Sequence, residues 1–335
     1  MILVTGGTGL VGAHLLYKLV HNKQKIKAIY RDEQKFRHVK QVFSCYSKDY
    51  ETLFNSITWV EADLLDITEL TDAFIGVTKV YHCAALVSFQ PNEYKLLRQT
   101  NIEGTANIVN MCLAKSVDKL CYVSSIATLG NELNNKPITE DSTWSPEAEN
   151  SAYAITKYGA EMEVWRATQE GLNAVIVNPG VIIGPGIWQS GSGSLFKKAH
   201  KGIPCYTAGT IGLVGVDDVV SIMIMLMDST INSERFVLVA ENWSYKTFLK
   251  ALALSVNSEP SKKLAHSNML ALAWRLDWLK QKLTGKKRQL TKRVAKSLNS
   301  ETYYNSDKIK TTLNYKFNAI DKTIANVGSI YLKQV

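Results

Sequence analysis

The 335-residue chain lacks long apolar runs, paired cysteines and histidines at metal-ligand spacing. No apolar run approaches the roughly 18 residues that a membrane-spanning helix requires. The five cysteines are scattered and form no C-x-x-C pair, which indicates a reduced, cytoplasmic chain with buried thiols. The six histidines show no metal-binding pattern, so no metal is expected. Residues 2–7 already resemble a strand and a turn, so no signal peptide is expected.

The positive charge is confined to one segment. Residues 261–300 contain eleven Lys and Arg and one acid, Asp277, for a net charge of +10, whereas the other 295 residues carry a net charge of −1. The overall net charge of +9 therefore describes this segment and not the whole surface. No nucleic-acid partner is expected on this ground.

Short β-branched runs alternate with amphipathic stretches over the first 180 residues. Predicted strands cover residues 2–5, 26–30, 57–61, 79–83, 119–124 and 174–178, and predicted helices cover 10–22, 92–115 and 151–169. Such alternation predicts βαβ units in a parallel sheet that is covered on both faces. Beyond residue 178 the pattern loosens, with a Gly/Pro/Ser-rich loop at 178–193 and one more clear strand at 235–240.

Glycines occupy the turn between the first strand and the first helix. Gly6, Gly9 and Gly12 form a G-x-x-G-x-x-G array, which suits a tight turn, close approach of backbone to a pyrophosphate and helix–strand packing. The free N–H groups at the helix start favour phosphates. The predicted cofactor-binding turn comprises Gly6, Thr8, Gly9, Leu10, Val11 and Gly12.

This turn predicts the fold class: α/β, a Rossmann-type doubly wound parallel sheet with a smaller, mainly helical C-terminal lobe. The dinucleotide-binding domain is expected to cover residues 1–178, with residues 213–240 returning to it. The substrate-binding lobe is expected to cover residues 179–212 and 241–335.

The end of the second strand bears on the cofactor. NAD-binding sites usually carry an acid here, which binds the ribose 2′-hydroxyl. In this chain the position is Tyr30, and the next residue is Arg31, whose guanidinium suits the 2′-phosphate of NADP. In the alternative interpretation Arg31 is solvated and Asp32 takes the acid's role. We expect NADP, with NAD as the alternative.

Tyr153 and Lys157 are predicted to lie on one face of a helix, four residues apart. A nearby cation lowers the pKa of a phenol, and a phenol so tuned can exchange a proton with a carbonyl or an alcohol. The same spacing recurs at Tyr304 and Lys308, far downstream in the lobe, where we interpret it as coincidence.

Ser124 and Ser125 follow a predicted strand, at the edge where open α/β sheets bind ligands. A serine there can donate a hydrogen bond to a reacting oxygen. The alternative is that both hydroxyls only cap the next turn.

Taken in order, the motifs resemble the extended short-chain dehydrogenase/reductase family over essentially the whole chain. They are Thr5-Gly-Gly-Thr-Gly-Leu-Val-Gly12, Ala62-Asp-Leu64, His82-Cys-Ala-Ala85, Thr100-Asn-Ile-Glu-Gly-Thr105, Val123-Ser-Ser125, Tyr153-x-x-x-Lys157, Asn178-Pro-Gly180 and Val216-Asp-Asp218.

The resemblance implies specific roles. Tyr153 would be the acid/base, Lys157 would tune it and hold the nicotinamide ribose, and Ser125 would bind the substrate oxygen. Asn101 would support the site geometry or a proton relay. The remaining implied cofactor contacts are Asp63 and Leu64 at the adenine, Ala84 and Ala85 through their backbone, and Asn178, Pro179 and Gly180.

Two positions separate branches of this family. Leu129 and Asn178-Pro179 stand where sugar-nucleotide epimerases usually carry an aromatic residue and Arg-Pro. With Arg31, they resemble the dihydroflavonol reductase, 3β-hydroxysteroid dehydrogenase and aldehyde/ketone reductase branch. We therefore expect an NADP-dependent carbonyl reductase or alcohol dehydrogenase with a small, hydrophobic substrate. The substrate would lie between the carboxyl edge of the sheet and the C-terminal lobe, with the loop 178–193 and the residues near Val216-Asp217 as its walls. The alternatives are an NAD-dependent nucleotide-sugar epimerase or dehydratase and a non-catalytic nucleotide sensor. A homodimer is a further expectation from the resemblance.

Residues 268–283 of the basic segment predict an amphipathic helix whose apolar stripe is Met269, Leu272, Leu276, Leu279 and Leu283, widened by Leu270, Trp274 and Trp278. We expect the helix to pack on the core with a solvated basic face. The alternatives are membrane-surface contact through residues 268–293 and a basic rim that recruits an anionic substrate. The stripe would also suit an apolar substrate pocket.

Overall fold

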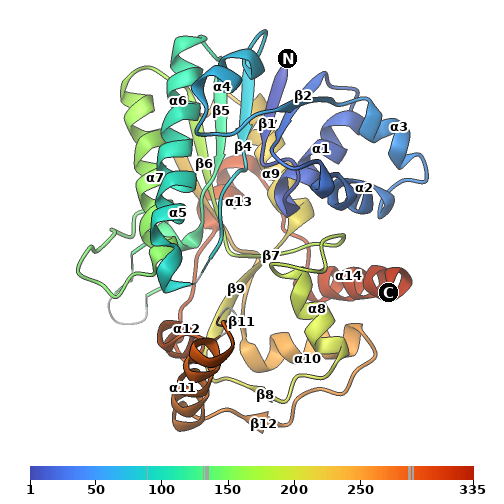
Figure 1. Ribbon diagram of the computed structural model, residues 1–335, viewed down its shortest axis with the longest axis vertical. Coiled ribbons are helices and arrows are strands. Elements are labelled where there is room, and N and C mark those ends of the chain that lie inside the picture. Colours follow the sequence, from blue (N-terminus) through green and yellow to red (C-terminus); the bar gives the residue numbers. More distant parts are fainter. Residues whose placement is uncertain (89, 131, 133–135, 286–287, 289) are drawn as a thin grey trace.

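The computed structural model describes residues 1–88, 90–130, 132, 136–285, 288 and 290–335. Lys286 and Lys287 of the basic segment lie outside the described residues. The upper part of the molecule in Figure 1 is a layered α/β half, and the lower part is a lobe formed by the chain after residue 178.

The α/β half is built on one parallel sheet. Its seven strands lie in the order β10-β6-β5-β4-β1-β2-β3, and every neighbouring pair is parallel. The strands are β1 (Ile2–Thr5), β2 (Ile26–Tyr30), β3 (Thr58–Glu61), β4 (Lys79–His82), β5 (Lys119–Val123), β6 (Ala174–Pro179) and β10 (Glu234–Leu238). The order reverses between β1 and β4, and such a switch point is where doubly wound sheets bind ligands. The predicted fold class is confirmed.

Helices cover both faces of this sheet, so its central strands β4, β5 and β6 are buried along most of their length and mainly apolar. One face carries α1 (Leu10–His21), α2 (Phe36–Ser44), α3 (Tyr50–Asn55) and α9 (Val216–Asp228). The other carries α4 (Ile67–Ala73), α6 (Gly104–Ala114) and α7 (Ala152–Gln169), preceded by the short α5 (Tyr94–Arg98). The single helix expected at 92–115 is in fact α5 and α6 joined by a π-helical turn, Gln99–Glu103.

The lobe contains small sheets that the sequence pattern did not predict. Strands β7 (Val181–Ile183), β9 (Thr210–Gly215) and β11 (Glu241–Ser244) form one, and β8 (Cys205–Tyr206) and β12 (Lys263–Leu264) form another. Its helices are α8 (Gly193–His200), α10 (Tyr245–Ser255), α11 (Ser267–Thr284), α12 (Lys292–Ser297) and α14 (Ile320–Gln334). The main lobe core lies between the three-stranded sheet and helices α8, α10 and α14.

The structure divides the chain slightly differently from the expected domains. Residues 213–215 belong to β9 of the lobe, whereas α9 and β10 return to the main sheet. Helix α13 (Asp307–Leu313), expected in the lobe, packs on the α/β half, because Ile309 is completely buried in the core beneath α1 and α9.

Helix α11 packs through Leu270 and Trp274, which were expected only to widen its apolar stripe. Leu270 is its buried residue and joins Ala265 and Ala295 in a small cluster, with Trp274 against it. The predicted apolar stripe faces outward, with Met269, Leu272, Leu276, Leu279 and Leu283 between 45% and 76% exposed. The expectation that this stripe packs on the core is therefore wrong, because the inner face is already filled by Leu270 and Trp274. Among the described residues, no helix is long and apolar enough to span a bilayer.

Candidate functional site

The glycine turn lies tightly against the segment that follows β4. Gly6 has a φ of +68°, and a Cβ on it would lie 2.5 Å from the Ala84 nitrogen. A Cβ on Gly12 would lie 2.2 Å from the Gly6 oxygen, so neither position accepts a side chain without moving backbone. Helix α1 begins at Leu10 without a capping side chain, which leaves its first N–H groups available to an anion. The turn residues Gly6 to Gly12 thus form a cradle that fits a dinucleotide pyrophosphate.

The residues expected at the adenosine end lie together on the surface. Arg31 and Asp63 form an ion pair of 3.2 Å, with side chains 55% and 39% exposed. The Tyr30 hydroxyl donates to Glu33, and the Asp32 carboxylate accepts the Gln34 N–H, which is a local cap of the next turn.

Leu64 differs from its expected role at the adenine. Its side chain is buried in the core beneath α6, and its carbonyl accepts a hydrogen bond from Asn107. Only the backbone of Leu64 is therefore left for a cofactor contact. Ala84 is half-buried and Ala85 is exposed, so the segment after β4 is open to a ligand.

A buried imidazole supports the floor of this turn. His82 contacts Thr5 Oγ1 through Nδ1 (2.6 Å) and Thr105 Oγ1 through Nε2 (3.0 Å). Burial, and then the charge of Lys157, lower the His82 pKa to about 3, so the ring is neutral. Thr5 Oγ1 also accepts the Ala84 N–H at 3.3 Å, which ties β1 to the segment after β4.

Ser125 and Tyr153 meet at the carboxyl end of β5. The Ser125 hydroxyl is close enough to the Tyr153 phenol to lower the Tyr153 pKa as a hydrogen-bond donor. The Ala127 N–H donates to Ser125 Oγ at 3.1 Å, which caps the 3-10 turn Ile126–Thr128 and leaves the serine hydrogen free to donate. The capping interpretation and the substrate-binding interpretation of Ser125 are therefore compatible. Ser124 instead donates to Glu161 and is buried.

Lys157 lies one helical turn after Tyr153 on α7 and is almost completely buried. Its ammonium donates to the Tyr122 hydroxyl (2.6 Å) and to the Val123 carbonyl (2.8 Å), and it lies over the Tyr122 ring. Burial lowers the Lys157 pKa to about 7, although Glu161 and Cys83 oppose the shift.

The expected lowering of the Tyr153 pKa by Lys157 is not seen. Burial raises the Tyr153 pKa, and the hydrogen bond from Ser125 opposes this only in part. The physical reason is that Lys157 directs its ammonium to Tyr122 and Val123. Tyr153 is therefore a neutral phenol at neutral pH.

Asn101 fixes the position of the segment after β4. Its Oδ1 accepts the Leu86 N–H (2.7 Å), and its Nδ2 donates to the Leu86 carbonyl (3.0 Å) and to Thr156 Oγ1 (3.1 Å). Asn101 therefore joins this segment to α7 next to Lys157. These contacts favour support of the site geometry over a proton relay.

Glu161 is a positioning residue that the sequence analysis missed. Its carboxylate is completely buried and accepts hydrogen bonds from Ser124 (2.5 Å), Thr128 (2.8 Å) and Asn178 (2.9 Å), and it pairs with Arg235 at 2.9 Å. These donors come from the ends of β5 and β6, from the turn after β5 and from β10. The available signal was spacing, because Tyr153, Lys157 and Glu161 are four residues apart on one helix.

This network changes the role of Asn178. Its side chain is fully buried, and its Nδ2 donates to Glu161, Thr128 and the Ser125 carbonyl, whereas its Oδ1 has no partner among the described residues. Pro179 is buried at the end of β6, and a Cβ on Gly180 would lie 2.5 Å from the Gly212 oxygen. Backbone contacts of Asn178, Pro179 and Gly180 with a cofactor stay a prediction.

The second Tyr–Lys pair has a different structure. Tyr304 precedes α13 and packs near Leu129 and Ile138, whereas Lys308 lies within α13 and pairs with Glu234. The two residues do not share a helix, and this supports their interpretation as coincidence.

A cavity of about 720 Å³ lies between the segment after β4 and the lobe. Leu86, Val87, Ser88, Gln90 and Glu93 line one side of it. The opposite side is lined by Ser190, Gly191, Tyr245, Arg288, Thr291, Val294, Ser297 and Leu298. Gln90 closes one end, because its side chain donates to the Arg288 carbonyl (2.5 Å) and accepts the Arg288 N–H (3.2 Å). None of the α11 stripe residues lines this cavity.

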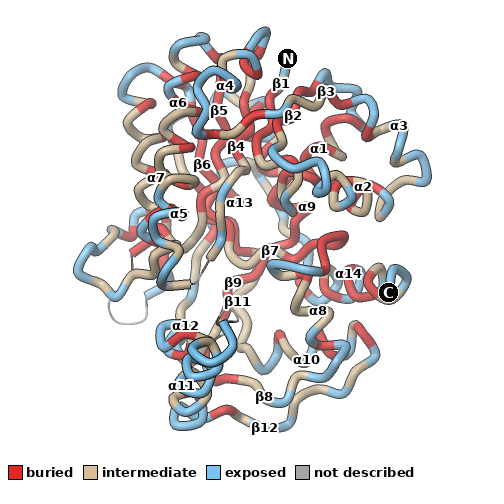
Figure 2. The backbone as a smooth tube through the Cα atoms, in the orientation of Figure 1, coloured by how far each residue is buried: buried red, intermediate tan, exposed pale blue. Residues whose placement is uncertain are grey.

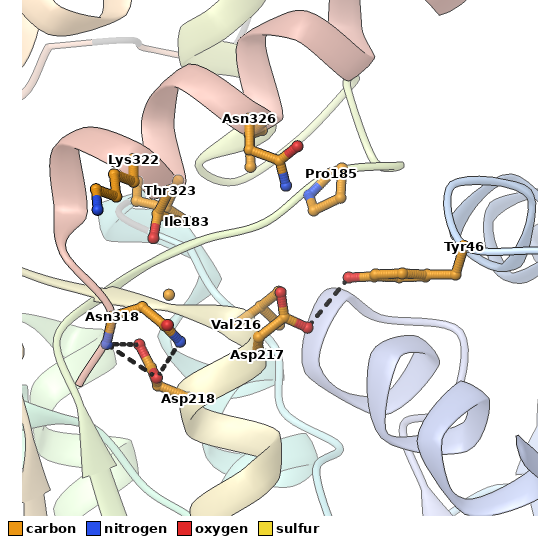
Figure 3. A pocket seen from close by; sticks show the side chains of 12 residues that line it. Tyr46, Ile183, Pro185, Val216, Asp217, Asp218, Asn318, Lys322, Thr323 and Asn326 are labelled. Atoms are coloured by element: carbon orange, nitrogen blue, oxygen red, sulfur yellow. Dashed lines mark hydrogen bonds between the residues drawn. The ribbon is translucent and has the colours of Figure 1, made fainter. Parts of the chain in front are cut away.

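Residues near Val216-Asp217, expected to form a wall of the substrate site, line a separate cavity of about 260 Å³. Figure 3 shows Asp217 facing Tyr46 there, and Asp218 held by Asn318. Asp218 is buried and also accepts the Tyr315 hydroxyl, so it fixes the chain leading into α14. This cavity is also lined by Ile183 and Pro185 of the loop 178–193, so a role of Val216 and Asp217 as a wall of the substrate site stays a prediction.

Comparison with known proteins gives one family. Residues 2–239 match the model of the NAD dependent epimerase/dehydratase family. The chain is 26% identical over 332 residues to a putative dihydroflavonol 4-reductase of Synechocystis, covering 96% of this chain and 92% of that protein. It is also 26% identical over 271 residues to the UDP-glucose 4-epimerase of Vibrio cholerae, covering 76% of each.

A solved structure has the same fold. The UDP-glucose 4-epimerase of Thermus thermophilus in complex with NAD superposes with a TM-score of 0.74 at 18% identity, and the match covers 100% of this chain and 99% of that one. The matched family range, residues 2–239, contains the glycine turn, Ser125, Tyr153 and Lys157.

Proposed function

Because the chain belongs to the NAD dependent epimerase/dehydratase family, whose members depend on NAD(P), we propose that it is an NADP-dependent oxidoreductase. It reduces a carbonyl, or oxidises an alcohol, on a small hydrophobic substrate. The observation that carries this proposal is the placement of Ser125, Tyr153 and Lys157 together at the carboxyl end of β5, where Lys157 holds the Val123 carbonyl.

The cofactor is held by the elements already described. The turn from Gly6 to Gly12 and the start of α1 bind the pyrophosphate, Arg31 binds the 2′-phosphate, and Asp63 lies at the adenine end. Ala84 and Ala85 line the cofactor through their backbone. When bound, the nicotinamide exchanges a hydride with the substrate carbon.

The chain itself supplies the proton. Tyr153 donates its hydroxyl proton to the carbonyl oxygen of the substrate during reduction, and Ser125 donates a hydrogen bond to the same oxygen. The raised pKa of Tyr153 suits this direction, because it keeps the phenol protonated at neutral pH. Lys157 holds the end of β5 through the Val123 carbonyl, and a contact with the nicotinamide ribose stays a prediction.

The cavity supports a small and mainly apolar substrate. Leu86, Val87, Val294 and Leu298 contribute apolar surface, and the serines and threonine supply a few hydrogen-bonding groups. One of its lining residues, Leu86, is tied by Asn101 to Thr156 of α7, the helix that carries Tyr153 and Lys157, although Ser125, Tyr153 and Lys157 do not themselves line the cavity. The similarity to a putative dihydroflavonol 4-reductase supports reduction of a ketone.

A second candidate is an NAD-dependent nucleotide-sugar epimerase or dehydratase. One contact favours it: Asp63 neutralises part of the Arg31 charge and so weakens the case for a 2′-phosphate. The similarity to UDP-glucose 4-epimerase also supports it. A cytoplasmic location, a homodimer and the absence of a nucleic-acid partner stay predictions, and a non-catalytic sensor is the candidate from another class.

The experiment is a cofactor-consumption assay on purified protein. Absorbance of NADPH and of NADH is followed with a panel of aromatic and aliphatic ketones, aldehydes and a dihydroflavonol. We expect consumption of NADPH with at least one hydrophobic ketone. Copurified NAD together with conversion of UDP-glucose and no carbonyl reduction would favour the epimerase. Cofactor binding without turnover of the carbonyl panel or of UDP-glucose would favour the non-catalytic sensor.

A further inference from the structure

Helix α11 exposes a continuous apolar surface. Met269, Leu272, Leu276, Leu279 and Leu283 follow one another at spacings of three and four residues, so they form a single row along the helix. Each is between 45% and 76% exposed. Figure 2 shows α11 as a mostly exposed helix at one extremity of the lobe, next to α12. An exposed apolar row of this length on a protein surface indicates a site that binds a partner outside the chain.

The inner side of α11 is already occupied, so the row cannot turn inward without displacing other contacts. Leu270 and Trp274 pack there with Ala265, Ala295 and Leu290. Asp277, the one acid in residues 261–300, accepts the Leu290 N–H at 2.9 Å. The inner face therefore holds the acid and the outer face holds the leucines.

Cations flank the row on both sides. In a helical projection, Arg275 and Lys282 lie along one edge of the row and Lys280 lies along the other, and all three are exposed. Trp278 is 47% exposed, and the Lys282 ammonium lies 5.5 Å from its ring centre. Leucines between cations, with a tryptophan at the edge, are the arrangement that helices adopt in the headgroup region of a bilayer.

The positive charge around the row also favours one binding partner over another. A second copy of the chain would bring the same cations, within a segment of net charge +10, against each other. A bilayer that contains anionic lipid has the complementary charge. Other exposed cations of this segment, including Lys292 and Arg293 at the start of α12, add to the same attraction.

We propose that α11 binds the surface of an anionic lipid bilayer. Met269 and the four leucines enter the boundary between headgroups and acyl chains, and Arg275, Lys280 and Lys282 contact lipid phosphates. This inference does not depend on the proposed reaction.

The experiment is co-sedimentation of the full chain with vesicles. Vesicles of phosphatidylcholine alone are compared with vesicles that also contain phosphatidylglycerol, at low and high salt. We expect binding to the anionic vesicles at low salt, a blue shift of tryptophan emission, and affinity at least about ten-fold lower for the neutral vesicles.

Two triple variants separate the two contributions. We expect Leu272→Gln/Leu276→Gln/Leu279→Gln and Arg275→Gln/Lys280→Gln/Lys282→Gln each to lower the affinity for anionic vesicles at least about ten-fold. The control Met225→Gln/Leu254→Gln, which replaces apolar residues 40% and 57% exposed on α9 and α10, should bind like the wild type. An unchanged melting temperature verifies that each variant is folded.

Three results would overturn the proposal. The first is wild-type protein that stays in the supernatant with anionic vesicles at low salt. The second is a leucine variant that binds as tightly as the wild type, which would mean adsorption by charge alone. The third is a wild-type dimer that the leucine variant converts to a monomer while neither binds vesicles, which would make the row an interface between copies.

Discussion

The candidate site at the carboxyl edge of the sheet buries polar side chains, whereas helix α11 exposes apolar ones. At the sheet edge, Lys157, Glu161 and Asn178 are polar yet almost completely buried, and donors or acceptors from neighbouring elements contact them. On α11, five apolar side chains are exposed while the one acid of the segment is turned inward. The first region is completed by the fold itself. In our proposal the second is completed by a lipid surface outside the fold.

The largest expected effect concerns the reactive phenol. Tyr153→Phe should lower the rate of carbonyl reduction about a thousand-fold, because it removes the proton donor and leaves the packing nearly intact. The measurement is steady-state NADPH consumption with a substrate found in the panel. The matched control is Tyr304→Phe, at the second Tyr–Lys pair, which should keep the wild-type rate. Equal losses in both variants would remove the distinction between the two pairs.

The buried carboxylate comes next. Glu161→Gln should lower the free energy of unfolding by about 3 kcal/mol, because it removes the negative charge paired with Arg235 and replaces one acceptor oxygen by an NH2 group that faces other donors. Urea unfolding measures this change. Glu163→Gln, on the same helix but paired on the surface with Arg166, should cost about 0.5 kcal/mol or less.

A positioning role for Glu161 also predicts a kinetic signature. Glu161 raises the Lys157 pKa, so Glu161→Gln should shift any limb of the pH–rate profile due to Lys157 to lower pH. A variant that loses stability with an unchanged profile would limit Glu161 to a structural role.

Lys157 predicts a dependence of stability on pH. Its folded pKa of about 7 lies below the ordinary value, so folding favours the neutral amine. Below pH 7 the folded state bears the full free-energy penalty of burying the charged ammonium. The penalty is relieved as the pH rises toward the unfolded value near 10.5. Relative to Lys157→Met, wild-type stability should therefore increase by about 2 kcal/mol between about pH 7.5 and 9.5. Urea unfolding of both proteins at the two pH values measures it, and a difference independent of pH would contradict the burial of a titrating ammonium.

The smallest effect concerns cofactor choice at the surface. Arg31→Gln should weaken NADPH binding about ten-fold and leave NADH binding unchanged, because only the 2′-phosphate needs the guanidinium. Arg98→Gln is the control, since Arg98 is equally exposed and also paired, with Glu103. Equal weakening of both cofactors by Arg31→Gln would leave no role for the 2′-phosphate.

The sequence predicted the parts of the molecule that depend on local pattern. The strands, the glycine turn and the Tyr153–Lys157 spacing each lie within one βα unit, where period and residue type are sufficient. The same spacing places Glu161 on the face of Tyr153 and Lys157, but its role could not be predicted, because its partners come from the ends of β5 and β6 and from β10 and converge only in the folded chain.

Helix α11 shows the other limit of the sequence. It carries apolar residues on two sides, with Leu270 and Trp274 on one and Leu272, Leu276 and Leu279 on the other. Periodicity identifies the helix but not the side that faces the core. The small sheet of β7, β9 and β11 was missed for a related reason, because two of its strands are only three and four residues long.

The most direct test of a nicotinamide cofactor site at the sheet edge is a tryptophan fluorescence titration with NADPH and with NADH. The wild type and two glycine variants are compared. Gly6 and Gly76 both have positive φ, but a Cβ at Gly6 would meet Ala84 whereas a Cβ at Gly76 has nothing within 4 Å. We predict saturable binding with NADPH tighter than NADH, retained in Gly76→Ala and weakened at least about a hundred-fold in Gly6→Ala. Binding of neither cofactor, or equal binding in Gly6→Ala and the wild type, would contradict the site.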